Sequence, residues 1–404
     1  MKKRIVLITT WFPPTNGVAV NRMEAFTKYF DHSRWEIIVL TLKKVPAAKS
    51  FENLEGISIY RLENNSFFQL AEFNKGHSRL KHYFKVAWNY FVRAVVQYPL
   101  KNWMNQVNRK LEDIHQEKQI DVIISSSSPL ETHLAVIPFL KKNNKVKWVA
   151  DARDELSKNP HLNEGAKKAS RSVENLINQR ASILTTVSKP IADDFSKLCP
   201  NVLVSEIRNG HNLDLPLLSN YQFNKVFTVT YAGTFYGQQK PTNFFSALIQ
   251  FLKADEYTRK VHLQFIGTPQ NFEVPSHSNL TVQFVSQCNY NEACRYQQSA
   301  DANLLILAKM NRAGVYSGKL FDYLAACKPI IAVVDPSDVA AKMIKDCKAG
   351  YIADFDNLNE IETAIYAAYQ DWNTKTILNC NRDKIEKLHR KYQVEKLNQL
   401  IDQL

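Results

Sequence analysis

Short hydrophobic runs alternate with longer amphipathic stretches along most of this chain. The runs that predict buried strands cover residues 4–9, 36–41, 57–61, 121–125, 146–150, 183–186, 202–207, 228–232, 262–266, 281–284, 304–307 and 330–334. Stretches with helical spacing lie between them, at residues 18–30, 129–142, 168–180 and 241–253. Strands that alternate with helices are typical of parallel sheets covered by helices. The pattern therefore predicts the α/β class with doubly wound sheets.

A break in the pattern divides the chain into two predicted domains. Residues 209–224 show no regular periodicity and contain Gly210 and Pro216, which is typical of a linker. We expect a Rossmann-like domain at residues 1–212 and a second one at 213–372. The polar segment 373–404 predicts a helix that returns to the first domain. A length of 404 residues suits two domains of ordinary size.

Both halves open with a hydrophobic strand, a loop that contains glycine, and a helix. In the first half the loop contains Asn16-Gly17, and in the second it begins at Gly233. Doubly wound sheets bind ligands beyond the carboxyl ends of their strands. Gly17 is compatible with a close backbone approach to a ligand, with a positive φ angle, or with a plain tight turn. These interpretations stay open at this point.

The segment after residues 304–307 contains the strongest candidates for a ligand-binding site. Ser317 is a candidate N-cap, and Gly318 and Lys319 stand where a helix begins. Free N–H groups and the positive end of the helix dipole favour phosphate oxygens there, and Lys319 adds a cation. Asp322 lies one turn further along, within reach of ribose hydroxyls. The arrangement suits a nucleoside diphosphate.

The same segment has a plainer interpretation. Any strand–loop–helix unit contains such a helix start, and a Gly-Lys pair alone is weak evidence. The spacing of a P-loop is also missing, because Ala313 replaces its first glycine and Leu320 its Ser/Thr. The pattern by itself leaves nucleotide binding and a structural helix start equally open.

The net charge of +13 is concentrated in one region. Residues 73–111 contain no acidic side chain but many cations and aromatic rings, and Phe84 and Trp88 recur at helical spacing. A basic aromatic helix at residues 77–110 would bind a membrane surface that carries anionic lipid. The alternative is a helix packed on its own domain with a solvated basic face. No nucleic-acid motif is present, so nucleic acid is not an expected partner.

Cysteines and apolar segments add constraints on location. The six cysteines are scattered without metal-ligand spacing, which predicts neither a zinc site nor a disulfide framework. The apolar N-terminal run is short and ends at Pro13-Pro14, so we interpret it as a strand and not as a signal peptide. No segment has the length of a membrane span. We expect a cytoplasmic protein that is either soluble or peripheral on the inner face of the cytoplasmic membrane.

Polar residues follow a predicted strand in the first half. Asp151, Arg153 and Asp154 come at its carboxyl end, and either aspartate is a candidate to orient an acceptor hydroxyl or take its proton. Arg153 is a candidate phosphate ligand, or the partner of an aspartate in a structural pair. His133 is a candidate acceptor contact, or a hydrogen-bonded structural histidine.

Several motifs, in this order, resemble the GT-B glycosyltransferases, in particular the family 4-like enzymes of surface polysaccharide assembly. The matching segments are residues 11–14 with Gly17, 125–129, 148–154, 159–160, 185–188, 207–210, 231–234 and 317–326. The resemblance covers roughly the first 370 residues. It implies two Rossmann-like domains that face a cleft, with the acceptor in the first and the sugar nucleotide in the second.

The resemblance also implies roles for single residues. Gly318 would open the diphosphate helix, and Asp322 matches the second acid of the family's Glu-x7-Glu pattern, which holds the ribose. The first acid falls at Gly314 and is missing, so the transferred sugar is undetermined. Thr234 stands at the position of a family arginine, and Lys240 loosely matches a family lysine.

The implied activity is transfer of a sugar, with retention, from a nucleoside diphosphate to a hydroxyl of a polyprenyl-linked or saccharide acceptor. No metal or other cofactor is implied. Two alternatives keep the same fold: a sugar-nucleotide epimerase or hydrolase, and a non-catalytic membrane-associated partner.

Overall fold

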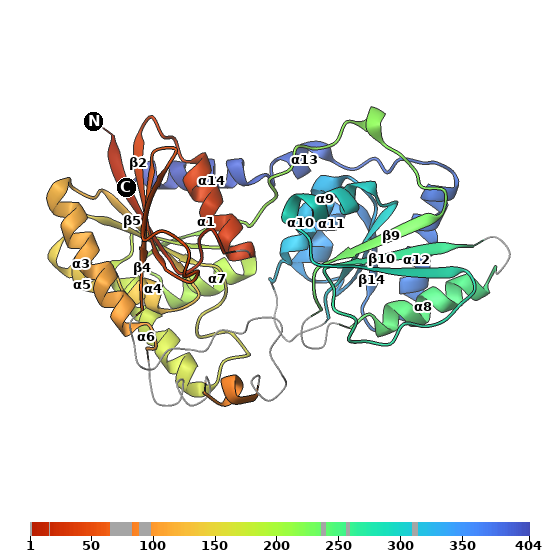
Figure 1. The fold of residues 1–404 in the computed structure, drawn as a ribbon, viewed down its shortest axis with the longest axis horizontal. Helices are drawn as coiled ribbons and strands as arrows, with labels where there is room; N and C mark the ends of the chain where they lie inside the picture. Colours follow the sequence, from red (N-terminus) through yellow and green to blue (C-terminus); the bar gives the residue numbers. More distant parts are fainter. Residues whose placement is uncertain are drawn as a thin grey trace. The chain divides into compact units, whose positions relative to one another are not determined.

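The computed structural model describes residues 2–15, 17–64, 83–88, 98–235, 240–255, 259–308 and 314–404. The chain forms two compact units (Figure 1). Unit 1 comprises Met1–Val187, Ile191–Ile207 and Val394–Leu404, and unit 2 comprises Ser188–Pro190 and Arg208–Gln393. The chain thus leaves unit 1 near residue 207 and returns near residue 394.

The central sheet of unit 1 has eight strands among the described residues, in the order β3-β4-β2-β1-β5-β6-β7-β8. All neighbouring pairs are parallel except β3 with β4. The strands are β1 (Lys3–Thr9), β2 (Trp35–Leu42), β3 (Phe51–Leu54), β4 (Ile57–Leu62), β5 (Val122–Ser127), β6 (Lys147–Ala152), β7 (Ile183–Thr186) and β8 (Leu203–Glu206).

Helices cover both faces of this sheet because alternate strand residues point to opposite sides. One face carries α3 (Lys101–Glu117), α4 (Glu131–Leu134), α5 (Ile137–Lys142), α6 (Glu164–Arg180) and α7 (Lys189–Leu198). The other carries α1 (Val18–Tyr29) and the end of α14 (Arg390–Asp402). In β1, for example, Val6 belongs to the first core and Leu7 to the second.

The sheet of unit 2 has six parallel strands among the described residues, in the order β11-β10-β9-β12-β13-β14. They are β9 (Phe227–Ala232), β10 (Val261–Ile266), β11 (Leu280–Val285), β12 (Ala302–Ile306), β13 (Ile330–Val334) and β14 (Gly350–Asp354). The strand order reverses between β9 and β12. The loops after these two strands therefore flank the place where doubly wound sheets bind ligands.

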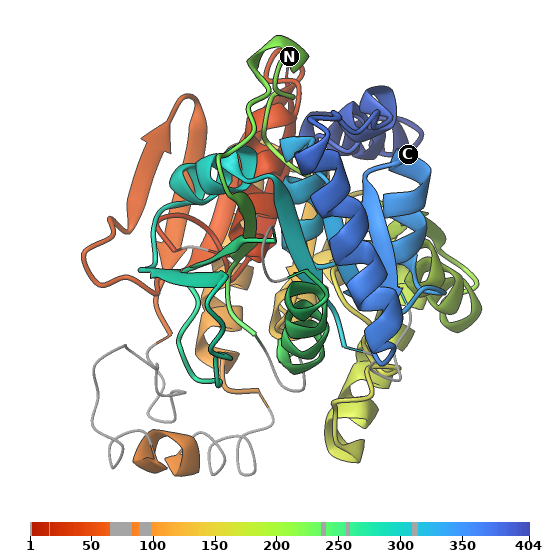
Figure 2. The same cartoon turned by 90° about the vertical axis from the view of Figure 1, so that its right-hand side faces the viewer.

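Two helical layers enclose this second sheet. In α8 (Thr242–Lys253) and α12 (Leu358–Asn373), apolar side chains pack on one face, and Figure 2 shows both helices, green and blue, in front of the sheet. The other face is covered by α9 (Tyr290–Ser299), α10 (Gly318–Ala326), α11 (Val339–Cys347) and α13 (Arg382–Glu386).

The hydrophobic pattern located these elements well. Each of the twelve predicted strands is present, and the α/β class with parallel sheets is confirmed. The edge strands β3 and β14 were missed, because their partly exposed sequences lack a long apolar run. The helix predicted at residues 129–142 is divided into α4 and α5.

Candidate active site

The site at the carboxyl edge of unit 2 is organised by α10. Leu320, Phe321 and Leu324 are buried against the sheet, which fixes the helix on β12 and β13. Ser317 occupies the N-cap position, but its side chain makes no capping hydrogen bond. The helix ends at Cys327, which adopts the left-handed conformation. The tip of α10 thus presents backbone N–H groups that no side-chain cap occupies.

Lys319 extends from the first turn of α10 toward the end of β9. Its Nζ donates a hydrogen bond to the hydroxyl of Tyr231 at 2.6 Å and lies 3.9 Å from the centroid of that ring. Burial lowers the pKa of Lys319 to about 7. The hydroxyl that accepts from Lys319 is neutral, so it does not offset the effect of burial. An anion bound beside Nζ would raise the pKa of Lys319 again and favour its charged form.

Gly233 directly follows β9 and lies beside this lysine. Its φ angle of 101° is one that glycine adopts readily and other residues avoid. A β-carbon at this position would lie 3.5 Å from Nζ of Lys319. Thr268 fixes the loop by donating a hydrogen bond to the Gly233 carbonyl at 2.5 Å. The structure thus places Lys319 beside Gly233, and the assignment of Gly233, Thr234 and Lys319 to a donor site stays a prediction.

Asp322 lies one turn further along α10 and is buried. The hydroxyl of Tyr290 donates a hydrogen bond to its Oδ1 at 2.6 Å. Burial raises the pKa of Asp322 to about 6, although the Tyr290 hydrogen bond and the charge of Arg390 act in the opposite direction. One carboxylate oxygen thus already has a protein donor, so a ribose contact through Asp322 stays a prediction.

The local structure explains why Gly314 stands where the family has its first acid. Gly314 has a φ angle of 88°, and its N–H donates to Oδ1 of Asp338 at 2.8 Å. A β-carbon there would lie 2.9 Å from Oγ of Ser188 and 3.0 Å from Cβ of Pro190. Both the backbone angle and the crowding therefore disfavour a glutamate in this conformation.

Lys240 is exposed and precedes α8. It lines a cavity of about 680 Å³ with residues of α8 and of the loop after β10, among them Phe245, Phe272 and Glu273. No contact of Lys240 with the tip of α10 is observed in the described part of unit 2. Its assignment to the donor site stays a prediction.

Comparison with solved structures places this arrangement in a known fold. Sucrose-phosphate synthase from Thermosynechococcus elongatus matches with a TM-score of 0.62 and 13% identity, over 100% of this chain and 99% of the other. The E. coli structure described as trehalose-6-phosphate bound with UDP-2-fluoro glucose matches at 0.60 and 11%, over 100% and 99%. TarM matches at 0.60 and 12%, over 99% of both chains.

The fold is GT-B. No protein-family model matches the sequence, and no curated protein matches it with significance. At these low identities the structural matches establish the architecture, and what this chain does must be argued from its own residues.

In the first GT-B unit, Asp151 forms a buried polar cluster. Its carboxylate accepts from Nη2 of Arg22 at 2.6 Å and from Nε of the same residue at 3.1 Å. The hydroxyls of Ser126 and Thr185 each donate to it at 2.8 Å. Burial raises the pKa of Asp151, but the charge and hydrogen bonds of Arg22, together with the hydrogen bonds from Ser126 and Thr185, hold it below the usual value. This geometry favours a structural role over that of a general base.

The arginine and the second aspartate of the motif have different surroundings. Nε of Arg153 donates to the Ser127 carbonyl, and Nη2 donates to the Ser128 carbonyl at 3.0 Å. Arg153 therefore fixes the loop after β5 through two backbone carbonyls, whereas the structural interpretation expected an aspartate as its partner. Asp154 is exposed at the same edge of the sheet and is the better placed of the two aspartates to meet a substrate.

His133 lies on α4 and is fully buried. The indole N–H of Trp148 donates to Oγ of Ser125, which lies 2.8 Å from Nδ1 of His133. Either Oγ of Ser125 or Nδ1 of His133 can be the donor, depending on the tautomer of the imidazole. Burial lowers the pKa of His133 to about 4. The structural interpretation accounts for the hydrogen bond at Nδ1, while Nε2 has no hydrogen-bond partner among the described residues.

The first glycine loop is described in part. Asn16 lies outside the described residues, while Gly17 is the N-cap of α1 with a φ angle of 142°. No atom lies within 4 Å of a β-carbon placed at Gly17. The positive φ angle therefore accounts for this glycine, and a close backbone approach is not required to explain it.

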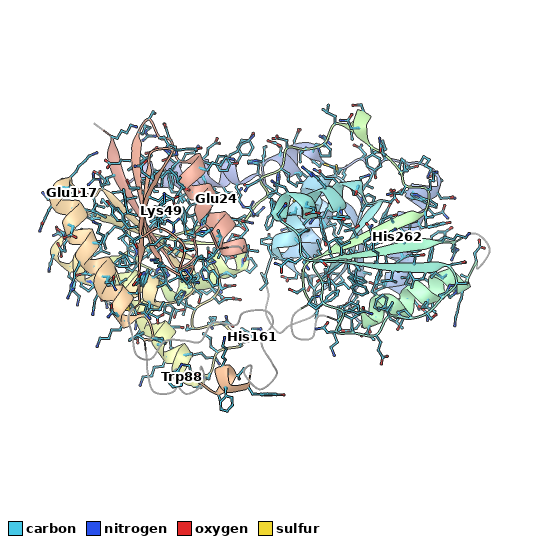
Figure 3. The ribbon with its side chains drawn as sticks, viewed as in Figure 1. Glu24, Lys49, Trp88, Glu117, His161 and His262 are labelled. Atoms are coloured by element: carbon cyan, nitrogen blue, oxygen red, sulfur yellow. The ribbon has the colours of Figure 1, made fainter. Side chains whose placement is uncertain are left out.

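The basic aromatic region is also described in part, because residues 77–82 and 89–97 lie outside the described residues. Residues 83–88 are helical, with Tyr83 71% and Phe84 70% exposed, and Trp88 is labelled in Figure 3. Trp103, by contrast, is a core residue of unit 1. This corrects the predicted membrane surface, whose aromatic part does not extend into α3. No described helix is long and apolar enough to cross a bilayer.

Two tyrosines at the unit 2 site were not predicted. Tyr231 positions Lys319, and Tyr290 positions Asp322. In the sequence Tyr231 lies in a segment that matches the family but received no role there, and Tyr290 is the first residue of a polar helix, so neither was assigned a function. Their roles become visible when the fold brings β9, α9 and α10 together.

Proposed function

We propose that this protein is a glycosyltransferase that takes a sugar from a nucleoside diphosphate donor. The observation that carries the proposal is the position of Lys319 beside Gly233, where the strand order of unit 2 reverses and α10 begins. The shared fold with synthases of sugar phosphates, and with a structure that contains UDP-2-fluoro glucose, supports this choice of donor.

The chemistry follows from charge. When the bond between sugar and diphosphate breaks, negative charge develops on the diphosphate. The N–H groups at the tip of α10 and the ammonium group of Lys319 stabilise that charge from fixed positions. Tyr231 holds the ammonium group in place, and Gly233 leaves its surroundings free of a side chain. These groups supply the stabilisation from the chain itself, and we propose that no metal ion is required.

Unit 1 would bind the acceptor, whose hydroxyl attacks the sugar. Asp154 is the proposed contact for that hydroxyl, because Asp151 is already fully engaged with Arg22. Retention of the anomeric configuration is proposed from the family resemblance. The proposed acceptor is a polyprenyl-linked or growing saccharide.

A lipid-linked acceptor requires the enzyme to work at a membrane surface. The exposed aromatic side chains of residues 83–88, in a region that lacks acidic residues, support attachment to anionic lipid. We propose a peripheral position on the inner face of the cytoplasmic membrane.

The experiment is incubation of the full chain with a panel of sugar nucleotides, with and without a lipid extract. Mass spectrometry would follow free nucleoside diphosphate and glycosylated lipid. Nucleotide release that depends on lipid supports the transferase. Turnover of the donor without lipid would indicate an epimerase or hydrolase, and no release from any donor would support a non-catalytic protein.

A further inference from the structure

Helix α10 is attached to the end of β9, beyond residues 229–230, where β9 pairs with β12. The N–H of Ala232 donates a hydrogen bond to the hydroxyl of Tyr323 at 2.9 Å. The hydroxyl of the preceding residue, Tyr231, accepts from Nζ of Lys319. Lys319 and Tyr323 are four residues apart and therefore lie on the same face of α10. Two hydrogen bonds thus hold this face of the helix against consecutive residues of β9.

The hydroxyl of Tyr231 has a defined direction. It donates its own hydrogen to the carbonyl oxygen of Thr234 at 3.2 Å. A tyrosine hydroxyl carries one hydrogen, so its lone pairs face Nζ of Lys319, which lies 2.6 Å away. A hydrogen bond from a charged donor is stronger than one from a neutral donor, so this arrangement favours the ammonium form of the lysine.

The ring of Tyr231 is fixed as well. It is fully buried, and Phe235 stacks on it with the ring centroids 4.1 Å apart and 19° between the planes. Phe235 in turn packs edge-on against Phe272, with 5.4 Å between the centroids. Nζ of Lys319 lies 3.9 Å from the centroid of the Tyr231 ring, close enough for a cation–π attraction. Tyr231 thus offers the lysine both its hydroxyl and its ring.

These contacts oppose the effect of burial on Lys319. Burial lowers the pKa of this lysine to about 7. A charge that is removed from water is costly unless a polar group is held against it. In this structure the directed hydroxyl of Tyr231 is such a group.

We propose that Tyr231 is a positioning residue of the donor site, whose directed hydroxyl keeps Lys319 charged and fixed beside Gly233. Tyr231 acts through the lysine and does not itself touch the diphosphate. The inference rests on the proposed function for the identity of the ligand, and it adds the group on which the charge of the lysine depends. A diphosphate then meets a cation that is already protonated and in place.

Tyr231→Phe is the informative variant, because it removes the hydroxyl and keeps the ring with its stack on Phe235. Circular dichroism checks its fold. Lysine labelled with carbon-13 at Cε reports the charge of each lysine by NMR, and the signal of Lys319 is the one that Lys319→Arg removes. We expect this signal to titrate at a lower pH in Tyr231→Phe, with a ratio of charged to neutral lysine about tenfold lower at about pH 8.

Tyr366→Phe is the control, because Tyr366 lies on α12 and is 43% exposed. It should leave the titration of Lys319 unchanged. The inference is overturned if the Lys319 signal titrates in Tyr231→Phe as it does in the wild-type protein, or if both variants shift it equally.

Affinity for UDP, measured by calorimetry, separates this inference from the proposed function. Tyr231→Phe should bind UDP about tenfold more weakly than the wild-type protein at about pH 8, and within about twofold at about pH 5.5, where both proteins carry a charged lysine. A loss of the same size at every pH would assign Tyr231 a purely structural role and overturn the inference. Absence of UDP binding by the wild-type protein would contradict the proposed function, while the NMR titration would still decide the role of Tyr231.

Discussion

Lys319 shows how an ordinary residue acquires a specific role from its surroundings. On an exposed helix it would keep its charge well above neutral pH. Here burial lowers its pKa to about 7, and its hydrogen-bond partner is the hydroxyl of Tyr231. A diphosphate beside Nζ would raise that pKa again, so binding of the ligand and uptake of a proton become coupled.

This coupling predicts the sign of a pH dependence. The protonated form of Lys319 binds the diphosphate, so affinity for UDP should be greatest below pH 7 and should fall as pH rises through the lowered pKa. The dissociation constant should increase by up to about tenfold per pH unit between pH 7 and 9. Fluorescence titration at several pH values measures it.

The matched control is Lys319→Arg, which keeps its charge throughout this range. Its affinity should depend little on pH. An equally steep dependence in both proteins would assign the effect to a different group.

Asp151 differs from Lys319 in this respect. It lies at the carboxyl end of β6, where a catalytic residue was predicted, but its contacts with Arg22 favour a structural role. Its ion pair with Arg22 is fully buried, at 2.6 Å. Removal of one partner leaves an unpaired charge in the core, so Arg22→Met should destabilise unit 1 by about 3–5 kcal/mol. Urea unfolding followed by circular dichroism measures the change.

Arg34→Met is the comparison for that variant, because Arg34 pairs with Asp402 on the surface. It should lose less than about 1 kcal/mol. Equal losses in the two variants would contradict the structural role assigned to the Arg22–Asp151 pair.

At the scale of elements, the loop between β12 and α10 is shaped by a glycine in place of the family's acid. The positive φ angle of Gly314 and the crowding by Ser188 and Pro190 act together. Gly56 separates the two effects, because it has a φ angle of 84° but no atom within 4 Å of the place that a β-carbon would take.

Both Gly314→Ala and Gly56→Ala should destabilise the protein through backbone strain, by about 1 kcal/mol. Gly314→Ala should lose about 1–3 kcal/mol more, because its β-carbon also meets Ser188 and Pro190. Differential scanning calorimetry compares the two. A Gly314→Ala variant as stable as Gly56→Ala would show that the loop moves freely aside.

The elements themselves were largely predictable from the sequence, and their contacts were not. Long apolar runs such as residues 330–334 predicted the strands, since burial of a parallel sheet demands them. Ser317 and Gly318 predicted the correct start of α10. The partners of Lys319 and Asp322 are tyrosines from β9 and α9, far away in sequence, and periodicity contains no information about such contacts.

At the scale of the whole molecule, the basic region at residues 77–110 predicts attachment of the protein to a membrane surface that carries anionic lipid. Neutralisation of Lys81, Lys85 and Arg93 to glutamine should reduce co-sedimentation with vesicles that contain anionic lipid, by about threefold or more. The control variant neutralises Lys342, Lys345 and Lys348, which are exposed cations of unit 2. Equal loss in both variants, or none in either, would contradict specific attachment through residues 77–110.

The account depends most directly on whether unit 2 binds a nucleoside diphosphate at the tip of α10. Isothermal titration calorimetry of the full chain with UDP at about pH 6.5 tests this. We expect saturable binding by the wild-type protein, weakened about 10- to 100-fold by Lys319→Met and unchanged by Lys342→Met at an exposed position of α11. Binding of UDP that Lys319→Met leaves intact, or a panel of nucleoside diphosphates none of which binds the wild-type protein, would contradict the proposed site.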